Sequence, residues 1–453
     1  MNVFEFPPRR REVPITDYNP PMLSLDQARQ MILTAIEPLP EETISLQDSL
    51  GRVAAANIIA TEDLVPFARS AMDGFAVRAA DTAGATIEQP IGLPIRGNAF
   101  AEAGAAELVP GAAIAISTGA PMPAGADAVI PIERVEPSCR GIRVRAPVFA
   151  GESVFPPAED VCKGELLLKR GAIVRGATIA LLAFAGHAQV SVRKQPRVSI
   201  LASGNELVEV AVEPVYGQIR NSNAPALIAL ATECGAQARF AGVAPDDPAA
   251  LRAMLESARA GADLVITTGG AGRGERDYMK ATLADLGAEF LFREVAMRPG
   301  RPAGFATWRG VPVFTLAGNP AAVFVSFHLL VRSALNRLLG CPNGAAPRLV
   351  ATLRERVHGR PGMAYAVFSK ASFGADGLEV TPLPNQCSAL VRTSAEASAL
   401  LFVPEDRDQL LAGEKVEIEV LNWQDVAGRS TSENSNVVTA ATEKAQVKNY
   451  SSQ

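Results

Sequence analysis

Histidine and cysteine are scarce in this sequence, and their scarcity excludes several kinds of site. Only three histidines occur among 453 residues, too few for a histidine-rich metal centre. His328 falls within the apolar run 323–331, where we expect a core or helix-face residue. The five cysteines are scattered and include no Cys-x-x-Cys pair. This pattern argues against a zinc site or a disulfide framework and favours reduced thiols in a cytosolic protein.

Long apolar runs and a strong net charge are also missing. No uncharged apolar stretch reaches the roughly 18 residues that suggest a membrane helix, and residues 1–21 lack the charge order of a signal peptide. The net charge of -5 argues against general nucleic-acid binding, which needs a basic face. A local arginine cluster could still bind a small anion. We therefore expect a cytoplasmic protein with neither a nucleic-acid nor a membrane partner.

Hydrophobic residues, in contrast, are abundant and make up 48% of the chain. Since a single hydrophobic core rarely serves more than about 250 residues, a chain of 453 residues should contain several domains. Near the N-terminus, Ser24 and Gln27 have the spacing of a capping box and precede apolar residues at helical spacing. They predict a helix that ends before Pro38.

The middle of the chain alternates between strand and helix patterns. Short apolar runs typical of buried strands are followed by segments with helical spacing, which predicts a mostly parallel sheet with helices on both faces. Ligands of such sheets bind outside the carboxyl ends of the strands. The predicted strands are 197–202, 238–243, 262–267 and 311–316, and the predicted helices are 224–233, 248–260, 278–286 and 321–339.

The fold class that follows is a multidomain α/β plus β protein. Residues before the α/β segment are rich in Gly, Pro and Ala with short strand patterns, whereas those after it predict a small β-barrel or sandwich and then a polar tail. The predicted parts are an N-terminal linker domain (21–61 and 155–195), an inserted β-rich domain (62–154), the α/β domain (196–342), a C-terminal β-barrel domain (345–423) and a disordered tail (424–453).

Two glycine-containing turns, 203–207 and 268–277, follow strands at the predicted ligand-binding edge of the sheet. Glycines let backbone N–H groups approach an anion closely, and Glu206 and Asp277 could hold a hard cation such as Mg²⁺. Either turn alone could equally be a tight connection, with Asp277 as a helix cap, but the pair favours a phosphate site. The glycines of the second turn are Gly269, Gly270 and Gly274.

Two later loops add anion-binding candidates. Arg298 and Arg301 are three residues apart in a proline-stiffened loop and could point at one oxyanion, although a solvated basic loop would have the same composition. Gly318, Asn319 and Pro320 follow the next strand and open the long helix. Proline is common in the first helical turn, and glycine suits the close approach of a ligand.

The inserted domain contains two loops of small and polar residues, 69–76 and 117–128, which by composition are only turns. Taken together, however, the loops form an ordered set of motifs: Ser-Ala-Met-Asp-Gly-Phe-Ala, Ser-Thr-Gly-Ala-Pro-x-Pro-x-Gly-Ala-Asp-Ala, Gly-x-Glu-Leu, Thr-Gly-Gly, x-Pro-Gly-x-Pro and Gly-Asn-Pro. This set resembles the MoeA family, which includes the E domain of gephyrin, and the resemblance covers roughly residues 21–422.

The resemblance implies an elongated homodimer whose site lies between the α/β domain of one chain and the inserted domain of the other. It implies that adenylylated molybdopterin and molybdate are the substrates, that AMP and the molybdenum cofactor are released, and that Mg²⁺ is required. The adenylyltransferase of the preceding step is a candidate partner. The implied catalytic residues are Asp73, Thr118, Glu206 and Asp277; Asp160 joins Glu206 and Asp277 as a metal ligand; Arg360 and Ser388 join the oxyanion site.

The sequence also departs from the family pattern. Arg298 and Arg301 stand where lysine is usual in the family. The positive charge is kept, but the planar guanidinium of arginine replaces the compact ammonium of lysine. Ala322 offers no hydroxyl where serine is usual, Asn205 replaces aspartate and Ala317 replaces proline. These changes favour an alternative: a non-catalytic paralogue that binds molybdopterin or acts as a scaffold. The retained carboxylates favour an enzyme, and the additional domains argue against a third interpretation, the preceding adenylyltransferase.

Overall fold

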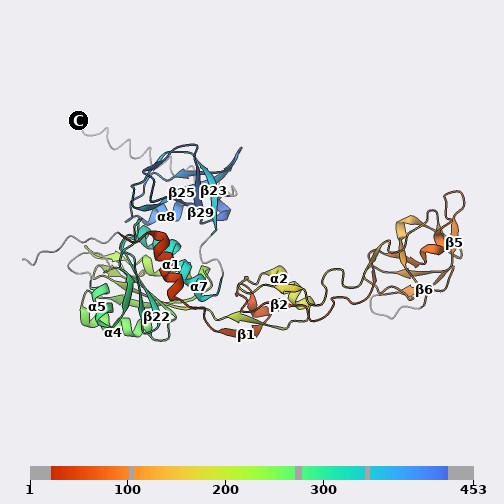
Figure 1. Ribbon diagram of the computed structural model, residues 1–453, viewed down its shortest axis with the longest axis horizontal. Coiled ribbons are helices and arrows are strands. Elements are labelled where there is room, and N and C mark those ends of the chain that lie inside the picture. Colours follow the sequence, from red (N-terminus) through yellow and green to blue (C-terminus); the bar gives the residue numbers. More distant parts are fainter. Residues whose placement is uncertain (1–21, 101–106, 271–277, 342–346, 427–453) are drawn as a thin grey trace, which may run out of the picture. The chain divides into compact units, whose positions relative to one another are not determined.

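The structure is a computed structural model that describes residues 22–100, 107–270, 278–341 and 347–426. The chain forms two compact units, residues 1–40 with 193–453 and residues 41–192 (Figure 1). Each unit has hydrophobic cores of its own. Within the described residues, every helix is too short or too polar to span a bilayer.

The first unit contains the predicted α/β domain, and its sheet has a switch in strand order at the centre. β14 (Arg197–Ser203) lies between β17 (Gln237–Ala244) and β18 (Leu264–Thr268), and β18 continues to β22 (Val311–Leu316), all in parallel register. The chain leaves β14 towards one edge and returns after β17 to the other side of β14. A crevice between the carboxyl ends of β14 and β18 is therefore the expected ligand position.

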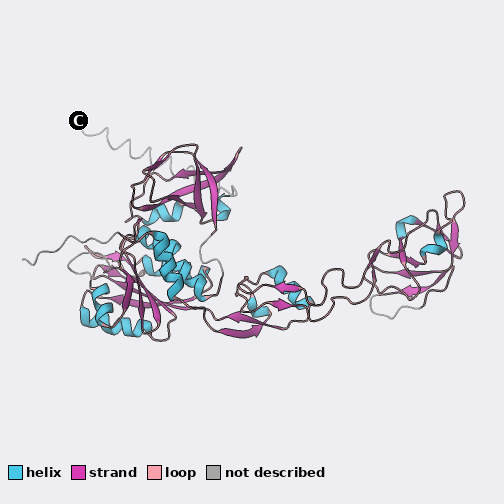
Figure 2. Cartoon of the chain, viewed as in Figure 1, coloured by secondary structure: helices cyan, strands magenta, loops and turns pink. Residues whose placement is uncertain are grey.

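Helices cover both faces of this sheet, as the sequence predicts (Figure 2). The side chains of β14 alternate: Val198 and Ile200 belong to the core on one face, and Leu201 to the core on the other. On the first face lie α3 (Asn223–Glu233) and α6 (Pro320–Ser326), and on the second lie α4 (Pro248–Arg259) and α5 (Met279–Asp285).

Two strands that the sequence did not predict extend the sheet. β21 (Gly304–Trp308) pairs antiparallel with β22, and β19 (Glu289–Phe292) pairs antiparallel with β21. The predicted helix 321–339 also differs in detail, because α6 and α7 (Arg332–Leu338) are separated by a π-helical turn, η4 (Phe327–Val331). The sheet remains mostly parallel, so the predicted fold class is confirmed.

The N-terminal helix α1 (Leu25–Ala35) begins with the predicted capping box, in which Gln27 N donates to the Ser24 hydroxyl and the Gln27 side chain accepts from Ser24 N. Although the sequence grouped it with the linker segment, α1 packs against α7 and η4 in the core of the first unit. Its buried face includes Ala28 and Ile32.

The C-terminal part of the first unit is the predicted β-barrel. Its strands run in the order β25–β26–β23–β29–β27, and β27 pairs again with β25 to close the ring. Residues 424–426, which the sequence assigned to the disordered tail, instead belong to α9 (Trp423–Val426), and Val426 is buried in the barrel core. The other bounds are β20 (Met297–Arg298), β23 (Arg348–Leu353), β24 (Val357–His358), β25 (Ala364–Gly374), β26 (Gly377–Pro382), α8 (Val391–Glu396), β27 (Ala399–Val403), β28 (Gln409–Leu410) and β29 (Lys415–Val420).

The second unit contains the linker strands and the inserted β-rich segment. In the insert, β4 (Gly74–Val77) lies between β7 (Ala113–Ile116) and β8 (Ala128–Pro131) in an antiparallel arrangement, and β6 (Ile95–Ala99) extends the sheet. A second small sheet consists of β5 (Ile91–Leu93), β10 (Gly141–Val144) and β9 (Val135–Ser138). The remaining bounds are β1 (Glu41–Ser45), β2 (Ile58–Ile59), β3 (Arg69–Ser70), β11 (Val154–Phe155), β12 (Leu166–Leu168), α2 (Gly176–Phe184) and β13 (Gln189–Arg193).

Candidate functional site

A cavity of ≈ 400 Å³ opens where the carboxyl ends of β14, β18 and β22 meet. This is the switch point of the sheet, so the cavity lies where α/β folds bind ligands. Five of the sequence-predicted site residues line it: Glu206, Gly269, Gly318, Asn319 and Pro320. The rest of the lining is Ser203, Leu207, Ile219, Arg220, Asn221, Ser222, Asn223, Thr268, Ala389 and Val391.

The glycine turns lie close to one another, and at Gly269 there is no room for a side chain. Gly269 has φ +88°, and a Cβ at this position would overlap the carbonyl oxygen of Ser203. A Cβ on Gly318 would lie 3.7 Å from the Cα of Gly269. At Gly270 a Cβ would lie 3.5 Å from the Ser203 hydroxyl, an ordinary contact. The glycine at 269 therefore lets the main chain of its turn approach the turn at Ser203 closely, at the edge where a ligand would meet backbone.

Asn223, at the start of α3, holds two of these turns together, and sequence analysis missed it. Its side-chain amide donates to the Thr268 hydroxyl (3.0 Å) and to the carbonyl of Gly318 (2.7 Å). The Thr268 hydroxyl donates in turn to the carbonyl of Ala317 (2.9 Å). The polar segment Asn221-Ser222-Asn223, which lies between a short strand and a helix, could have indicated a site residue here.

The barrel contributes to the same cavity through its segment 388–391. Asn319 donates from its side-chain amide to the hydroxyl of Ser388 (3.2 Å), and the backbone N–H of Ala321 donates to the carbonyl of Ser388 (3.1 Å). Ala389 and Val391 complete this side of the lining. The structure thus brings the predicted residue Ser388 next to Asn319, although 69 residues separate them.

Glu206 provides the acidic side chain of the lining and is exposed. Its carboxylate lies beside Gly204, where an added Cβ would come within 2.5 Å of a carboxylate oxygen. The hydroxyls of Ser203 and Thr268 belong to the same lining. Mg²⁺ is commonly bound through one or two carboxylates together with substrate phosphates, so these oxygen donors fit that ion. Within the described residues, no cluster of three or more metal-binding side chains occurs.

The predicted arginines are not part of this lining. Arg301 forms an ion pair with Glu294 (3.1 Å), and the guanidinium of Arg298 lies 6.0 Å from the ring centre of Tyr365. Arg360 is exposed in a turn of the barrel. The structure therefore does not bring these arginines together around the cavity.

Asp73 and Thr118, which the resemblance implied as catalytic residues, are brought together in the inserted domain. The backbone N–H and the hydroxyl of Thr118 both donate to Asp73 Oδ1, at 2.7 and 3.0 Å. These hydrogen bonds, the backbone one foremost, lower the pKa of Asp73 below its ordinary value, because they favour the carboxylate. Asp73 lies on the surface of the second unit, ionised and oriented by Thr118.

The remaining predicted residues are not brought to the cavity by the described part of the chain. Asp160 is exposed in the loop between β11 and β12 of the second unit. Gly274 and Asp277 lie outside the described residues, and their predicted roles stay predictions.

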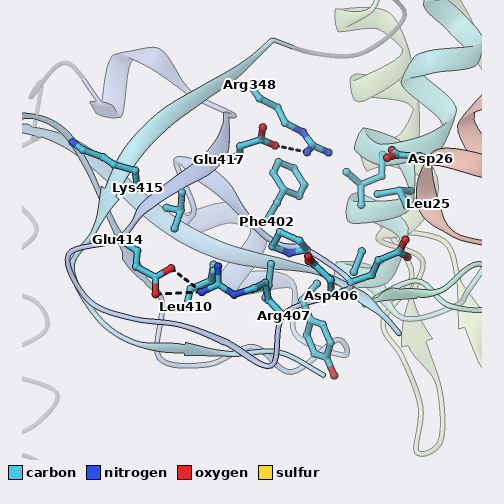
Figure 3. Close-up of a pocket in the computed structure, with 17 residues that line it drawn as sticks. Leu25, Asp26, Arg348, Phe402, Asp406, Arg407, Leu410, Glu414, Lys415 and Glu417 are labelled. Atoms are coloured by element: carbon cyan, nitrogen blue, oxygen red, sulfur yellow. Dashed lines mark hydrogen bonds and ion pairs between the residues drawn. The ribbon is translucent and has the colours of Figure 1, made fainter. Parts of the chain in front are cut away.

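A larger cavity of ≈ 570 Å³ lies elsewhere in the first unit, between the barrel and α1 (Figure 3). Arg348 pairs there with Glu417 (2.6 Å), and Arg407 with Glu414 (2.9 Å). None of the sequence-predicted site residues lines this cavity. We therefore place the candidate site at the smaller cavity, where the switch point, the glycine turns and Glu206 coincide.

These features define a class: a multidomain α/β protein with a ligand crevice at the switch point, an inserted β-rich domain and a C-terminal β-barrel. Comparison with protein families gives three matches in the same order along the chain. They are the MoeA N-terminal region (domain I and II) at residues 23–186, a probable molybdopterin binding domain at 199–337, and the MoeA C-terminal region (domain IV) at 350–421.

Individual relatives agree with these matches. The molybdopterin molybdenumtransferase of Staphylococcus aureus (strain MSSA476) is 33% identical over 406 residues, which cover 89% of this chain and 97% of the relative. The Staphylococcus epidermidis protein of the same name (strain ATCC 12228) is 33% identical over 398 residues, or 87% and 95%. A solved structure of the molybdopterin biosynthesis MoeA protein from Pyrococcus horikoshii OT3 has 30% identity and a TM-score of 0.77, covering 88% of this chain and all (100%) of that one. The chain belongs to the MoeA family.

Proposed function

We propose that this protein catalyses the insertion of molybdenum from molybdate into adenylylated molybdopterin, releasing AMP in the last step of molybdenum cofactor biosynthesis. The observation that carries the proposal is the meeting of three glycine-containing turns and Glu206 at the switch-point cavity. The family relationship extends over 97% of a relative named molybdopterin molybdenumtransferase, so it includes every domain that the site needs.

The described residues suit the cleavage of a phosphoanhydride. The turns at Gly269 and Gly318 bring backbone close to the ligand, and Asn223 fixes their separation. Glu206, together with Asp277, would hold Mg²⁺, and Asp160 is a further candidate ligand. The ion, when bound, would neutralise charge on the phosphate oxygens. Arg298, Arg301, Arg360 and Ser388 remain candidates for the molybdate oxyanion.

We include a homodimer in this proposal, with Asp73 and Thr118 of one chain completing the site of the other. Helix α2 supports a second copy as partner. Its nine residues carry no charge, yet only Leu182 is buried and the side chain of Phe184 is 55% exposed. A helix that is apolar all round normally lies inside a protein, and a symmetric copy would cover it. The adenylyltransferase of the preceding step would deliver the substrate to this dimer.

The test is release of AMP from adenylylated molybdopterin in the presence of molybdate and Mg²⁺. The Glu206→Gln variant should slow release by about 100-fold, since it removes a charge from the metal-binding side of the cavity. Glu209→Gln is the matched control: Glu209 is also exposed and close in sequence but does not line the cavity. The control should release AMP at the parent's rate.

The alternative of a non-catalytic paralogue makes a different prediction for the same assay. A scaffold would bind the substrate and release no AMP at any concentration of Mg²⁺. The retained Glu206 and the hydrogen-bonded pair of Asp73 and Thr118 support the enzyme, whereas the alternative rests on the departures at Arg298, Arg301 and Ala322. Absence of AMP from the parent protein would overturn the proposed enzyme.

A further inference from the structure

The charge on the cavity lining comes from two side chains. Among the described lining residues, Glu206 is the acidic one and Arg220 the basic one. Arg220 did not enter the sequence-based site, which placed the positive charge at Arg298 and Arg301. Neither of those arginines lines the cavity, so within the described part of the chain Arg220 is the side chain that brings positive charge to it.

Arg220 and Glu206 are held by one small ribbon. β15 (Leu207–Val208) pairs with β16 (Ile219–Arg220), so that Val208 lies opposite Arg220. The backbone N–H of Ile219 also donates to the carbonyl of Glu206 (2.8 Å). The ribbon therefore fixes the backbone positions of the acidic and the basic residue relative to each other.

Among the residues that the structure describes, the guanidinium of Arg220 has one hydrogen-bond partner in the chain. Its Nε donates to the carbonyl of Val210 (3.0 Å). The two terminal nitrogens of the fork then remain for a ligand, which is the arrangement that binds a phosphate through two parallel hydrogen bonds. The residue is exposed, so an anion can reach it.

We propose that Arg220 binds the phosphate of the nucleotide part of the substrate, and retains it on AMP until release. The assignment rests on the proposed function, which supplies the adenylyl group. Asn221, Ser222 and Asn223 follow Arg220 along the lining, and the last two open α3, so the polar segment 220–223 forms one wall of the phosphate subsite. The acidic wall is Glu206, on the metal-binding side.

The test measures binding of AMP and of adenosine by calorimetry, without turnover. Arg220→Ala should weaken AMP binding at least roughly tenfold and leave adenosine binding within about twofold, because only AMP carries the phosphate. Arg220→Lys should keep part of the AMP affinity, because the lysine ammonium keeps the positive charge but cannot form the two parallel hydrogen bonds of a guanidinium. Arg252→Ala, an exposed arginine of α4 away from the lining, is the control and should bind both ligands as the parent does.

Each other outcome overturns the assignment. Equal losses for AMP and adenosine would show that Arg220 only supports the ribbon. A larger AMP loss in Arg298→Ala than in Arg220→Ala would place the phosphate at the other loop, and a parent that binds no AMP would leave Arg220 without its ligand. Failure of the proposed function looks different: AMP binding would depend on Arg220, but adenylylated molybdopterin would yield no AMP.

Discussion

Gly269 shows how closely the residues of the site pack against the sheet. Its φ of +88° belongs to glycine, and its missing Cβ leaves space for the carbonyl of Ser203. Gly269→Ala should therefore lower the free energy of unfolding of the α/β domain by roughly 3 kcal/mol, through backbone strain and overlap together. Thermal melting of the variant measures this loss.

Gly310→Ala is the matched control for Gly269→Ala. Gly310 has a similar φ of +80°, but a Cβ there would meet nothing within 4 Å. This variant should lose only the cost of the left-handed conformation, roughly 1 kcal/mol. Equal melting of the two variants would mean that the turn at Gly269 relaxes and that close packing does not explain its glycine.

Sequence patterns identified some residues of the site and not others, for physical reasons. Glu206, Gly269 and Gly318 follow strand ends, so the position of each in its own turn was enough. The pairing of Arg301 with Glu294 is a local contact that competes with an anion, and composition could not show it. Asn223 acts by bridging turns of two other strands, which only tertiary structure reveals.

At the scale of elements, the π-helical turn η4 carries a buried polar cluster. His328 Nδ1 lies within hydrogen-bond distance of Glu419 of β29 (2.7 Å), and Arg332 donates to the same carboxylate and also contacts His328 Nδ1 (2.5 Å). Burial lowers the pKa of His328, against the opposing effect of Glu419. Burial opposes ionisation of Glu419, but the hydrogen bond with His328 and the positive charge of Arg332 hold the pKa of Glu419 below its usual value. The cluster therefore contains a neutral histidine and a carboxylate.

This cluster predicts a dependence of stability on pH. With its folded pKa lowered, His328 contributes stability above its ordinary pKa of 6.5, and the contribution is lost as pH falls and the unfolded chain takes up the proton. The melting temperature of the first unit should fall between pH 7.5 and 5.5, and His328→Gln should flatten that dependence. His358→Gln, at an exposed position, should keep the parent's profile. An unchanged slope in His328→Gln would contradict the assignment.

The short helix α9 gives a second prediction at this scale. Val426 is 2% exposed and packs in the barrel core. A chain that ends at Val426 should melt like the full chain, whereas one that ends at Trp423 should melt a few degrees lower, because burying a valine contributes about 1.5–3 kcal/mol. Equal melting of both truncations would show that α9 adds nothing to the barrel.

Strands inside the alternation of strand and helix patterns were predicted, and several strands outside it were missed. The strands at β14, β18 and β22 are apolar runs bounded by turns, and their bounds differ from the predicted ones by at most two residues. β27 is buried along its whole length, a pattern that a buried helix would share. β19 and β21 join the sheet antiparallel, outside the strand–helix alternation that served as the guide.

At the scale of the whole molecule, the candidate residues are divided between the two units. Glu206 and the glycine turns belong to the first unit, and Asp73 and Thr118 belong to the second. The fold class followed from the sequence because each core has its own apolar pattern. The proposed division of one site between chains, in contrast, would be a property of an assembly, which no pattern within a single chain records.

Mixing two inactive variants tests that division. If Asp73 of one chain completes the site around Glu206 of the other, a dimer of one Asp73→Asn chain and one Glu206→Gln chain contains one site with both substitutions and one with neither. Half of the dimers in an equal mixture are mixed, so AMP release should recover to about a quarter of the parent's rate.

Asp73→Asn mixed with Thr118→Val is the control. Both changes lie in the second unit, so every site carries one of them and the mixture should stay inactive. An inactive Asp73–Glu206 mixture of chains shown to exchange, or a monomer by light scattering, would place the complete site within one chain.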